Sequence, residues 1–352
     1  MIENQPAITG VFGSNQLMQS WIGACRMKLI QWTDTDAYFN LAAEEYVFDR
    51  MDRTEEYLLL WQNRNAIVVG KHQNTVEEVN AQYVQEHGVQ VVRRLSGGGA
   101  VYHDMGNLNF TIIGDAEGNK FNFQKLSQPI VQTLGRMGAE VQFSGRNDLL
   151  MDGRKISGNA QFVRGSRLLH HGTLLFHSDL DMISNVLTVK GDKIESKGVK
   201  SVRSRVTNIN DHAPNITIPD FKELLEETLL KDRDIQHYVF TETDRAGITA
   251  LRENKYSTWE WNYGRSPEYD IRKERRFSGG GVCLYMRVNE GVIQSIRIMG
   301  DYFGDGEIED MENRLVNVKL NEQAVHNALE AVEVGFFIHG MTVEELVQII
   351  VH

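Results

Sequence analysis

The sequence of 352 residues predicts an α+β protein with a large domain followed by a small C-terminal domain. Short apolar runs closed by tight turns alternate with segments of helical spacing, and this mixture is typical of α+β folds. An aromatic segment without periodicity, residues 259–270, divides the chain and resembles a linker. With 41% hydrophobic and 24% charged residues, the chain has the composition of an ordinary soluble globular protein. The expected parts are an N-terminal extension, a large domain, and a linker with the small domain, at residues 1–26, 27–262 and 263–352.

The first half of the large domain is expected to combine one long helix with several buried strands. Apolar and aromatic residues recur on one helical face at 37–51, whereas other apolar runs are short. These short runs predict strands at 57–62, 66–72, 89–94 and 108–113. Between them, Thr75 and Glu78 match a capping box, which predicts a single helix through His87 that ends at Gly88.

The second half of the large domain is expected to continue the alternation. Four apolar residues at helical spacing predict a helix, namely Leu126, Ile130, Leu134 and Met137. Pro129 fits only in the first turn of that helix, so the helix should begin near Ser127. Asp152-Gly153 predicts a hairpin turn, and a helix should start near Pro219. The small domain should contain two strands and two helices, at 276–287, 291–298, 321–333 and 342–351, the last with a capping box of Thr342 and Glu345.

The overall charge and the cysteine count exclude several classes of protein. A formal net charge of −11 argues against a general nucleic-acid binder, although local arginines can still bind a small anion. No apolar run approaches the roughly 18 residues of a membrane span. Cys25 and Cys283 are too few for a disulfide framework or a cysteine-based zinc site. Residues 21–25, WIGAC, resemble a lipoprotein cleavage box, but residues 1–20 lack a basic start and an apolar core, so we expect a cytoplasmic protein.

The stretch RRLSGGGAVYHD, residues 93–104, is the first candidate for a binding site. Each of its three consecutive glycines costs roughly 0.5–1 kcal/mol relative to alanine, which is explained if backbone amides must approach a ligand closely. Free N–H groups in such a turn bind anions, and Arg93 and Arg94 add charged, forked donors. The alternative is a tight hairpin turn with a solvated arginine pair. The spacing matches neither common phosphate loop, so a different fold would have to hold an anion.

Two further segments carry candidate site residues. NDLLMDGRKISGNAQ, residues 147–161, places Lys155 near Ser157 and Gly158, just after the predicted hairpin turn. HHGTLLF, residues 170–176, has adjacent histidines at the start of a predicted strand. Taken alone, the lysine fits a solvated strand end and each histidine fits a structural role, because a zinc pair would need further ligands.

Together these three segments resemble the lipoate–protein ligases, which are relatives of the biotin–protein ligases. The matching motifs are R-R-x-S-G-G-G-A-V-[FY]-H-D-x-G-N, K-[IV]-[SA]-G-x-A and H-H-G-T-L-L, at residues 93–107, 155–160 and 170–175. The basic segment at 196–209, which overlaps a basic loop from Lys193 to Arg205, is also similar to a basic loop of this family. The resemblance covers about residues 27–352 and leaves residues 1–26 without a counterpart.

The resemblance implies a large mixed-sheet catalytic domain of the biotin/lipoate ligase type and a small α+β accessory domain. Such ligases join lipoate to ATP with Mg²⁺, release pyrophosphate, and pass the lipoyl group from lipoyl-AMP to a lysine of a carrier. The implied partners are lipoate and the lipoyl domains of 2-oxoacid dehydrogenase E2 subunits or the glycine cleavage H protein. No nucleic-acid or membrane partner is expected.

Lys155 is the catalytic candidate that the resemblance implies. A carboxylate is already a nucleophile at neutral pH, so the reaction needs no general base. It needs charge screening between the carboxylate and the α-phosphate, which an ammonium group can supply. On this resemblance we assign ATP to Arg94, Gly99, Ala100, Val101, Tyr102, Lys155 and Asp148, lipoate to Gly97, Gly98, His103, Lys155 and His171, and Mg²⁺ to Asp148.

Several alternatives stand beside this interpretation. RRFSGGGVCLY, residues 275–285, repeats the letters of the glycine turn but lacks the residues that follow it, so it is expected to be a glycine-rich strand start in the accessory domain. A lipoyl or octanoyl transferase would use a cysteine nucleophile and no ATP, and neither cysteine lies near the three motifs. Biotin ligase has a different glycine loop. A non-catalytic acyl or nucleotide carrier is disfavoured because the lysine motif is intact.

Overall fold

A large mixed sheet forms the centre of the structure, which is a computed structural model that describes residues 26–144, 147–187, 205–231, 234–264, 269–277 and 279–352. The strands of this sheet lie in the order β11-β1-β2-β6-β10-β9-β8-β7. β1 is parallel to both β2 and β11, and the other pairs are antiparallel, so the sheet is mixed as the resemblance implies. Its strands are β1 (Arg26–Gln31), β2 (Glu56–Trp61), β6 (Asn107–Asp115), β7 (Gln142–Ser144), β8 (Asp148–Met151), β9 (Arg154–Arg164), β10 (Arg167–Leu175) and β11 (Asp234–Tyr238).

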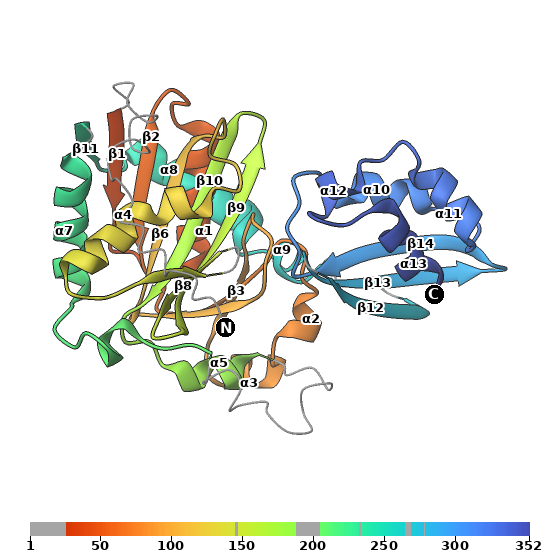
Figure 1. The fold of residues 1–352 in the computed structure, drawn as a ribbon, viewed down its shortest axis with the longest axis horizontal. Coiled ribbons are helices and arrows are strands. Elements are labelled where there is room, and N and C mark those ends of the chain that lie inside the picture. The colour runs from red at the N-terminus through yellow and green to blue at the C-terminus, as the bar shows by residue number, and fades with distance from the viewer. Residues whose placement is uncertain (1–25, 145–146, 188–204, 232–233, 265–268, 278) are drawn as a thin grey trace, which may run out of the picture.

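Helices cover both faces of this sheet (Figure 1), which explains why β2 is apolar or aromatic at every position after Glu56. Leu58 and Leu60 point into the core beneath α4 and α7, whereas Leu59 and Trp61 point into the core beneath α1. Since successive side chains of a strand alternate between faces, a strand covered on both sides has no solvent-facing position to fill with polar residues. The covering helices are α1 (Ala37–Arg50), α4 (Phe123–Arg136), α7 (Ile218–Leu230) and α8 (Glu242–Leu251).

A smaller sheet, β4-β3-β5, carries the glycine turn between β4 and β5. β3 pairs with β4 in parallel and with β5 antiparallel, so the last residue of β4 and the first residue of β5 lie at the same end of the sheet, where the turn joins them. The elements are β3 (Asn65–Val69), β4 (Gln90–Arg93), β5 (Val101–Asp104), α2 (Thr75–Glu78), α3 (Ala81–Glu86), α5 (Leu180–Val186) and a short 3₁₀ turn (Ile209–Asp211). Among the described residues, every helix is too short or too polar to cross a lipid bilayer.

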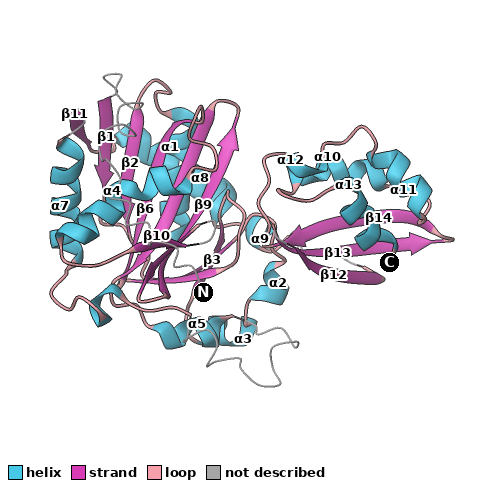
Figure 2. Ribbon diagram, in the orientation of Figure 1, coloured by secondary structure: helices cyan, strands magenta, loops and turns pink. Residues whose placement is uncertain are grey.

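The C-terminal part has a hydrophobic core of its own, between an antiparallel three-stranded sheet and helices on one of its faces (Figure 2). Its elements are β12 (Ile271–Phe277), β13 (Gly280–Asn289), β14 (Val292–Gly300), α10 (Ile308–Leu315), α11 (Glu322–Leu329), α12 (Val334–Phe337) and α13 (Val343–Val351). The capping box of Thr342 and Glu345 is confirmed at the start of α13. The expected strand at 276–287 is the end of β12 plus most of β13, so this sheet has one strand more than predicted. The domain boundary between residues 262 and 263 stays a prediction.

The predicted single helix from Thr75 to His87 is wrong, because the chain forms two short helices there. The Asn80 side chain accepts from the Tyr83 backbone N–H and starts α3 anew, which breaks the run. Thr75 is fully buried and caps nothing. Its hydroxyl donates to the Asn262 carbonyl at 2.6 Å instead. A buried partner from a distant part of the chain has displaced the local capping pattern.

The predicted start near Ser127 is also wrong, since α4 begins at Phe123 and Pro129 lies inside it. The Asn122 side chain accepts from the Lys125 backbone N–H and caps the helix one turn earlier than expected. An internal proline costs about 3 kcal/mol. The helix tolerates it because one face is buried in the core beneath the large sheet, through Phe123, Leu126, Ile130 and Leu134.

The aromatic segment predicted as a linker begins with a helix, α9 (Trp259–Asn262), that packs against β4. Arg93 binds this helix to the small sheet, and its guanidinium is fully buried. It donates to the carbonyls of Trp261 and Asn262 on one side, and to carbonyls of residues 70, 71 and 73 on the other. Arg93 therefore supports the glycine turn from behind.

Other elements were not predicted: β11, α8, the π-helical turn Arg252–Tyr256 and α10. β11 is an edge strand with mostly exposed residues, and α8 contains Gly247 within a polar sequence. β11 and α8 each have weak apolar periodicity. They form because they pack against a more apolar neighbour, β1 for the strand and α1 for the helix.

Arg93→Lys should lower the free energy of unfolding by about 3 kcal/mol, because a lysine has fewer donors and leaves several buried carbonyls without partners. Arg136→Lys is the control, since Arg136 forms a half-exposed ion pair with Glu227 and its replacement should change stability by less than about 0.5 kcal/mol. Urea denaturation monitored by circular dichroism measures both. Equal stability of the two variants would contradict the supporting role of Arg93.

Candidate functional site

The candidate site is a cavity of about 100 Å³ between the large and small sheets, with one wall from the C-terminal domain. The predicted site residues Arg94, Gly98, Gly99, Val101, His103, Lys155 and His171 all line it. Leu41, Trp61, Val68, Asn109, Asn147, Gly158, Asn159, Ala160, Gly172, Thr173 and Phe303 complete the lining. The structure thus brings the three sequence segments together in space.

Strand alternation decides which residues of β5 reach the cavity. Val101 and His103 face it, whereas the Tyr102 side chain points to the opposite side, packs with Val69 and Val91, and donates its hydroxyl to Asn65 Oδ1. Gly97 and Ala100 belong to the same turn but do not line the cavity. The side chain of Tyr102 therefore does not reach the site, and a nucleotide contact by this residue can involve its backbone alone.

Arg94 is buried inside the bend of the glycine turn and holds its shape. The guanidinium donates to the carbonyls of Gly97 at 2.7 Å, Gly99 at 2.9 Å and Val68 at 3.1 Å, and to Ser96 Oγ at 3.0 Å. Burial lowers the pKa of Arg94 to about 10, against an opposing effect of Glu44, so the group is charged at neutral pH. Much of the donor capacity that the sequence suggested for a phosphate is used within the turn.

The three consecutive glycines differ in how closely the rest of the protein packs against them. A Cβ at Gly97 would lie 2.3 Å from the Tyr302 carbonyl oxygen, so the C-terminal domain itself excludes a side chain there. Gly98 has a φ of +92°, and a Cβ on it would meet the Arg94 guanidinium and the Phe303 ring. Gly99 is exposed and has no atom within 4 Å of a Cβ position. The packing of the protein therefore requires glycine at the first two positions but not at the third.

Lys155 reaches the cavity because of an irregularity in its hairpin. The predicted turn is confirmed, with positive φ at both Asp152 and Gly153, as a type I′ turn requires. A β-bulge then shifts the register of β9, so that Lys155 pairs with Leu150 and its side chain lies over Gly158, on the face that carries Asp148. Lys155 Nζ lies 2.8 Å from Asp148 Oδ1, and both side chains are about one-third exposed, at 35% and 34%.

The end of the predicted basic loop lies beside this lysine. Residues 188–204 lie outside the described part of the chain, but the Lys155 N–H donates to the Arg205 carbonyl at 2.8 Å. The Thr207 N–H donates in turn to the Lys155 carbonyl at 2.9 Å. The chain therefore returns from the basic segment directly at the candidate catalytic residue.

His171 belongs to a buried network that sequence reasoning missed. Its Nδ1 lies 2.8 Å from Glu44 Oε1 and its Nε2 lies 2.6 Å from Ser96 Oγ, while Thr111 Oγ1 donates to the same carboxylate oxygen. Ser96 does not line the cavity and accepts from Arg94, so this arrangement holds the glycine turn and offers no exposed nucleophile. Glu44 lies three residues after Leu41, on the buried face of the first predicted helix. A carboxylate at a buried position was the sequence signal that could have identified it.

The two other motif histidines differ in position. His170 is fully buried and contacts Ser127 and Gln161 outside the cavity, whereas His103 lines the cavity. Burial lowers the pKa of each to about 3, so both rings are neutral at pH 7. No group of three or more possible metal ligands occurs in the described part of the chain, and Asp148 is a single carboxylate paired with Lys155.

The C-terminal domain closes one side of the cavity. The Gly98 N–H donates to the Tyr302 carbonyl, Phe303 lines the cavity, and Lys71 pairs with Glu307 at 3.0 Å. No sequence pattern pointed to Phe303, because its role depends on how two domains meet. The second glycine run is confirmed as the start of β13 in this domain, where the Gly281 N–H donates to Asp301.

Comparisons with known protein families cover both parts of the chain. A family model described as "Lipoyl protein ligase A/B catalytic domain" matches residues 36–230, and one described as "Bacterial lipoate protein ligase C-terminus" matches residues 266–350. Lipoate-protein ligase LplJ of Bacillus subtilis is 43% identical over 320 residues, which cover 90% of this chain and 97% of that protein. Lipoate–protein ligase 1 of Staphylococcus aureus is 43% identical over 317 residues, with the same shares covered.

Solved structures show the same similarity. A crystal structure of P. falciparum LipL1 in complex with lipoate has a TM-score of 0.78 at 25% identity and covers 92% of this chain and 99% of that one. A crystal structure of lipoate-protein ligase A bound with ATP has a TM-score of 0.59 at 27% identity, over 69% of this chain and 99% of that one. The α+β architecture expected from the sequence is confirmed by these matches.

Gly98→Ala should lower the free energy of unfolding by about 1–3 kcal/mol, because alanine is strained at positive φ and its methyl group would press on Arg94 and Phe303. Gly99→Ala is the matched control and should change stability by less than about 0.5 kcal/mol, since its methyl group would face open space. Guanidinium denaturation of the two variants tests the difference. A larger loss for Gly99→Ala would contradict this division of the turn.

Proposed function

The chain belongs to the lipoate–protein ligase family, and we propose that the cavity between its glycine turn and Lys155 is where lipoate is adenylated. The chain is an ATP-dependent lipoate–protein ligase, which converts lipoate to lipoyl-AMP and transfers the lipoyl group to a lysine of a carrier protein. The observation that carries the assignment of the site is the position of Lys155. A partly exposed ammonium group stands at the rim of a cavity whose lining also includes the buried side chains of Leu41, Trp61, Val68 and His103.

Lys155 would act by screening charge in both half-reactions. In the first, a lipoate carboxylate oxygen forms a bond to the α-phosphorus and the bond to the pyrophosphate oxygen breaks. Both reactants are anions, so a point charge that donates to each lowers the barrier. In the second, the amine of the carrier lysine attacks the lipoyl carbonyl and AMP departs, and the same ammonium group polarises that carbonyl. Asp148 holds the ammonium group in place before ligands arrive.

The nucleotide would lie along the exposed edge of the glycine turn. Gly99 is open to solvent there and its missing side chain is not explained by the protein's own packing, which supports close approach of a phosphate. We assign ATP to the backbone of Gly99, Ala100, Val101 and Tyr102. Arg94 contributes mainly by holding the turn, and its charge adds to the positive potential of the site.

The buried end of the cavity would hold the lipoyl chain, in contact with Gly98, His103 and His171. Gly97, also predicted to contact lipoate, does not line the cavity and packs against the Tyr302 carbonyl. Mg²⁺ would be held by Asp148 together with phosphate oxygens, because one partly exposed carboxylate plus a nucleotide is a common way of binding this ion. When bound, the ion neutralises phosphate charge. The acceptors are carrier proteins, and we assign them to the lipoyl domains of 2-oxoacid dehydrogenase E2 subunits or the glycine cleavage H protein. A bi-partite lipoate protein ligase of Thermoplasma acidophilum has been described with its E2 lipoyl domain.

Lys155→Ala should reduce lipoate-dependent ATP–pyrophosphate exchange by about 10³-fold, because the charge between two anions is then unscreened. Lys155→Arg should retain little of the exchange activity, since a planar guanidinium does not reproduce a compact point charge. Lys28→Ala is the control, because Lys28 forms a similar ion pair with Glu55 outside the cavity. Near-normal exchange by Lys155→Ala would overturn the assignment, provided that its circular dichroism spectrum matches that of the wild type.

A double variant, Cys25→Ser with Cys283→Ser, should keep full ligase activity, because no thioester intermediate is required. Cys283 is buried in the C-terminal sheet beside Tyr285 and Met299, and burial raises its thiol pKa, so it is a poor nucleophile. Cys25 lies outside the described residues. Mass spectrometry of the wild type during turnover is the complementary measurement, and an acyl group found on either sulfur would place the protein with the transferases.

A further inference from the structure

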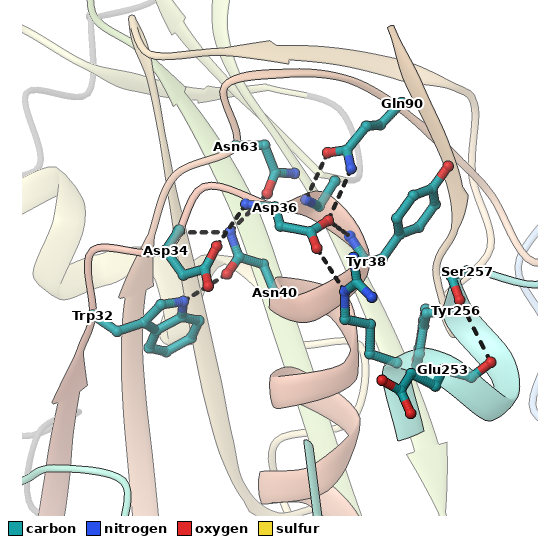
Figure 3. Close-up of polar contacts among 12 residues, drawn as sticks. Trp32, Asp34, Asp36, Tyr38, Asn40, Asn63, Gln90, Glu253, Tyr256 and Ser257 are labelled. Atoms are coloured by element: carbon teal, nitrogen blue, oxygen red, sulfur yellow. Dashed lines mark hydrogen bonds and ion pairs between the residues drawn. The ribbon is translucent and has the colours of Figure 1, made fainter. Parts of the chain in front are cut away.

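A chain of hydrogen bonds that begins at Trp32 fixes the proton position of His103. Figure 3 shows its first members, Trp32, Asn40 and Asn63. The Trp32 indole N–H donates to Asn40 Oδ1 at 2.6 Å. An indole can only donate, so the orientation of the Asn40 amide is determined. Asn40 Nδ2 then faces the backbone carbonyls of Asp34 and Gln62, at 3.1 and 2.9 Å, and both can only accept. The orientation of Asn40 is therefore settled by three independent partners.

The same logic continues through Asn63 to the cavity. Asn40 Nδ2, which shares its two hydrogens among three oxygens, lies 2.9 Å from Asn63 Oδ1, so Asn63 presents its oxygen to Asn40 and its Nδ2 to His103. The reverse orientation would set two amide donors against each other. Asn63 Nδ2 lies 3.1 Å from His103 Nδ1, which must accept. The neutral ring therefore carries its proton on Nε2.

His103 Nε2–H is a buried donor that no group in the described part of the chain satisfies. The residue is 3% exposed and lines the cavity, and its Nε2 contacts no acceptor within the described ranges. Burial, followed by the charge of Arg94 and the nearby His171, lowers the pKa of the ring to about 3, so it stays neutral at pH 7. Buried N–H groups are almost always paired, so this donor points to a ligand acceptor.

The position of the donor indicates which atom of the ligand it meets. Its neighbours in the lining include Leu41, Trp61 and Val68, all nearly fully buried, whereas Lys155 stands at the exposed rim. Lipoate has acceptors only at its two ends, the carboxylate and the dithiolane sulfurs. If the carboxylate lies at Lys155, the buried donor meets the sulfurs. A sulfur lone pair is a weak acceptor, and a terminal methyl group offers none.

We propose that His103 Nε2–H donates a hydrogen bond to a dithiolane sulfur and thereby makes the site prefer lipoate to acyl chains that end in carbon. The proposal rests on the proposed function. An all-carbon chain would displace water from the donor and leave it without a partner, and a site built to hydrogen-bond its substrate discriminates against analogues that lack the bonding group.

The test compares lipoate with 5-cyclopentylpentanoate, in which a cyclopentane ring replaces the dithiolane, and with octanoate. The measurement is kcat/KM in ATP–pyrophosphate exchange. The wild type should prefer lipoate to the cyclopentyl acid by about tenfold. In His103→Phe the ratio should fall to near one, whereas His170→Phe, which removes a buried imidazole outside the cavity, should keep it. Equal use of the two acids by the wild type would overturn the proposal even if no variant folds. Exchange with none of the acids would overturn the proposed function itself.

Asn63→Asp tests the proton position without changing the shape of the site. A carboxylate would accept from both Asn40 Nδ2 and the histidine, so at pH 9 the single ring proton moves to Nδ1 and Nε2 presents a lone pair to the sulfur. The preference for lipoate should then disappear. At pH 6 the carboxylate favours the doubly protonated ring, which restores the donor and the preference. Arg94 and His171, the charged and titratable groups that act on His103, are present in both proteins. The wild-type ratio should be equal at the two pH values, and a pH-independent ratio in Asn63→Asp would contradict the proton assignment.

Discussion

The buried guanidinium of Arg94 is the interaction on which the site depends. It sits inside the bend of the glycine turn and donates to Gly97, Gly99 and Val68 carbonyls and to Ser96. A backbone bent this tightly directs several carbonyl oxygens inward, and only a planar, forked cation can satisfy them together. Glu44 and His171 continue the network into the core, through Ser96. The turn is therefore rigid before any ligand binds, which is the condition for electrostatic preorganisation.

This rigidity separates the roles of neighbouring residues. Gly97 and Gly98 allow the turn to pack against Tyr302 and Phe303 of the C-terminal domain, and Phe303 completes the wall of the cavity. Gly99 is the open position of the turn, and Lys155 stands across from it on a different sheet. The reacting groups would meet between a fixed turn and a lysine that, among the described residues, is held by one ion pair. A lysine held so loosely can exchange its partner for substrate anions at small energetic expense.

Patterns with a local physical cause were predictable from the sequence, and those decided by distant contacts were not. The hairpin turn at Asp152-Gly153 and the cap of α13 depend on neighbouring residues and are confirmed. Thr75 matched a local capping pattern, but its hydroxyl bonds to Asn262, far along the chain. The motifs identified Lys155 and Arg94, but the residues that these two side chains contact could be found only in the folded structure. Ser96 and Glu44 join through His171, and the β-bulge that turns Lys155 into the cavity has no clear sequence signal.

The most direct test of the account is a crystal structure of the wild type with a non-hydrolysable lipoyl-adenylate analogue. The account predicts that Lys155 Nζ leaves Asp148 and lies within hydrogen-bond distance of both the acyl carbonyl oxygen and the phosphate-mimicking group. The contacts of Arg94 to the turn should be unchanged, and the dithiolane ring should lie against His103 Nε2. An analogue bound outside the cavity, with the Lys155–Asp148 pair intact, would contradict the account.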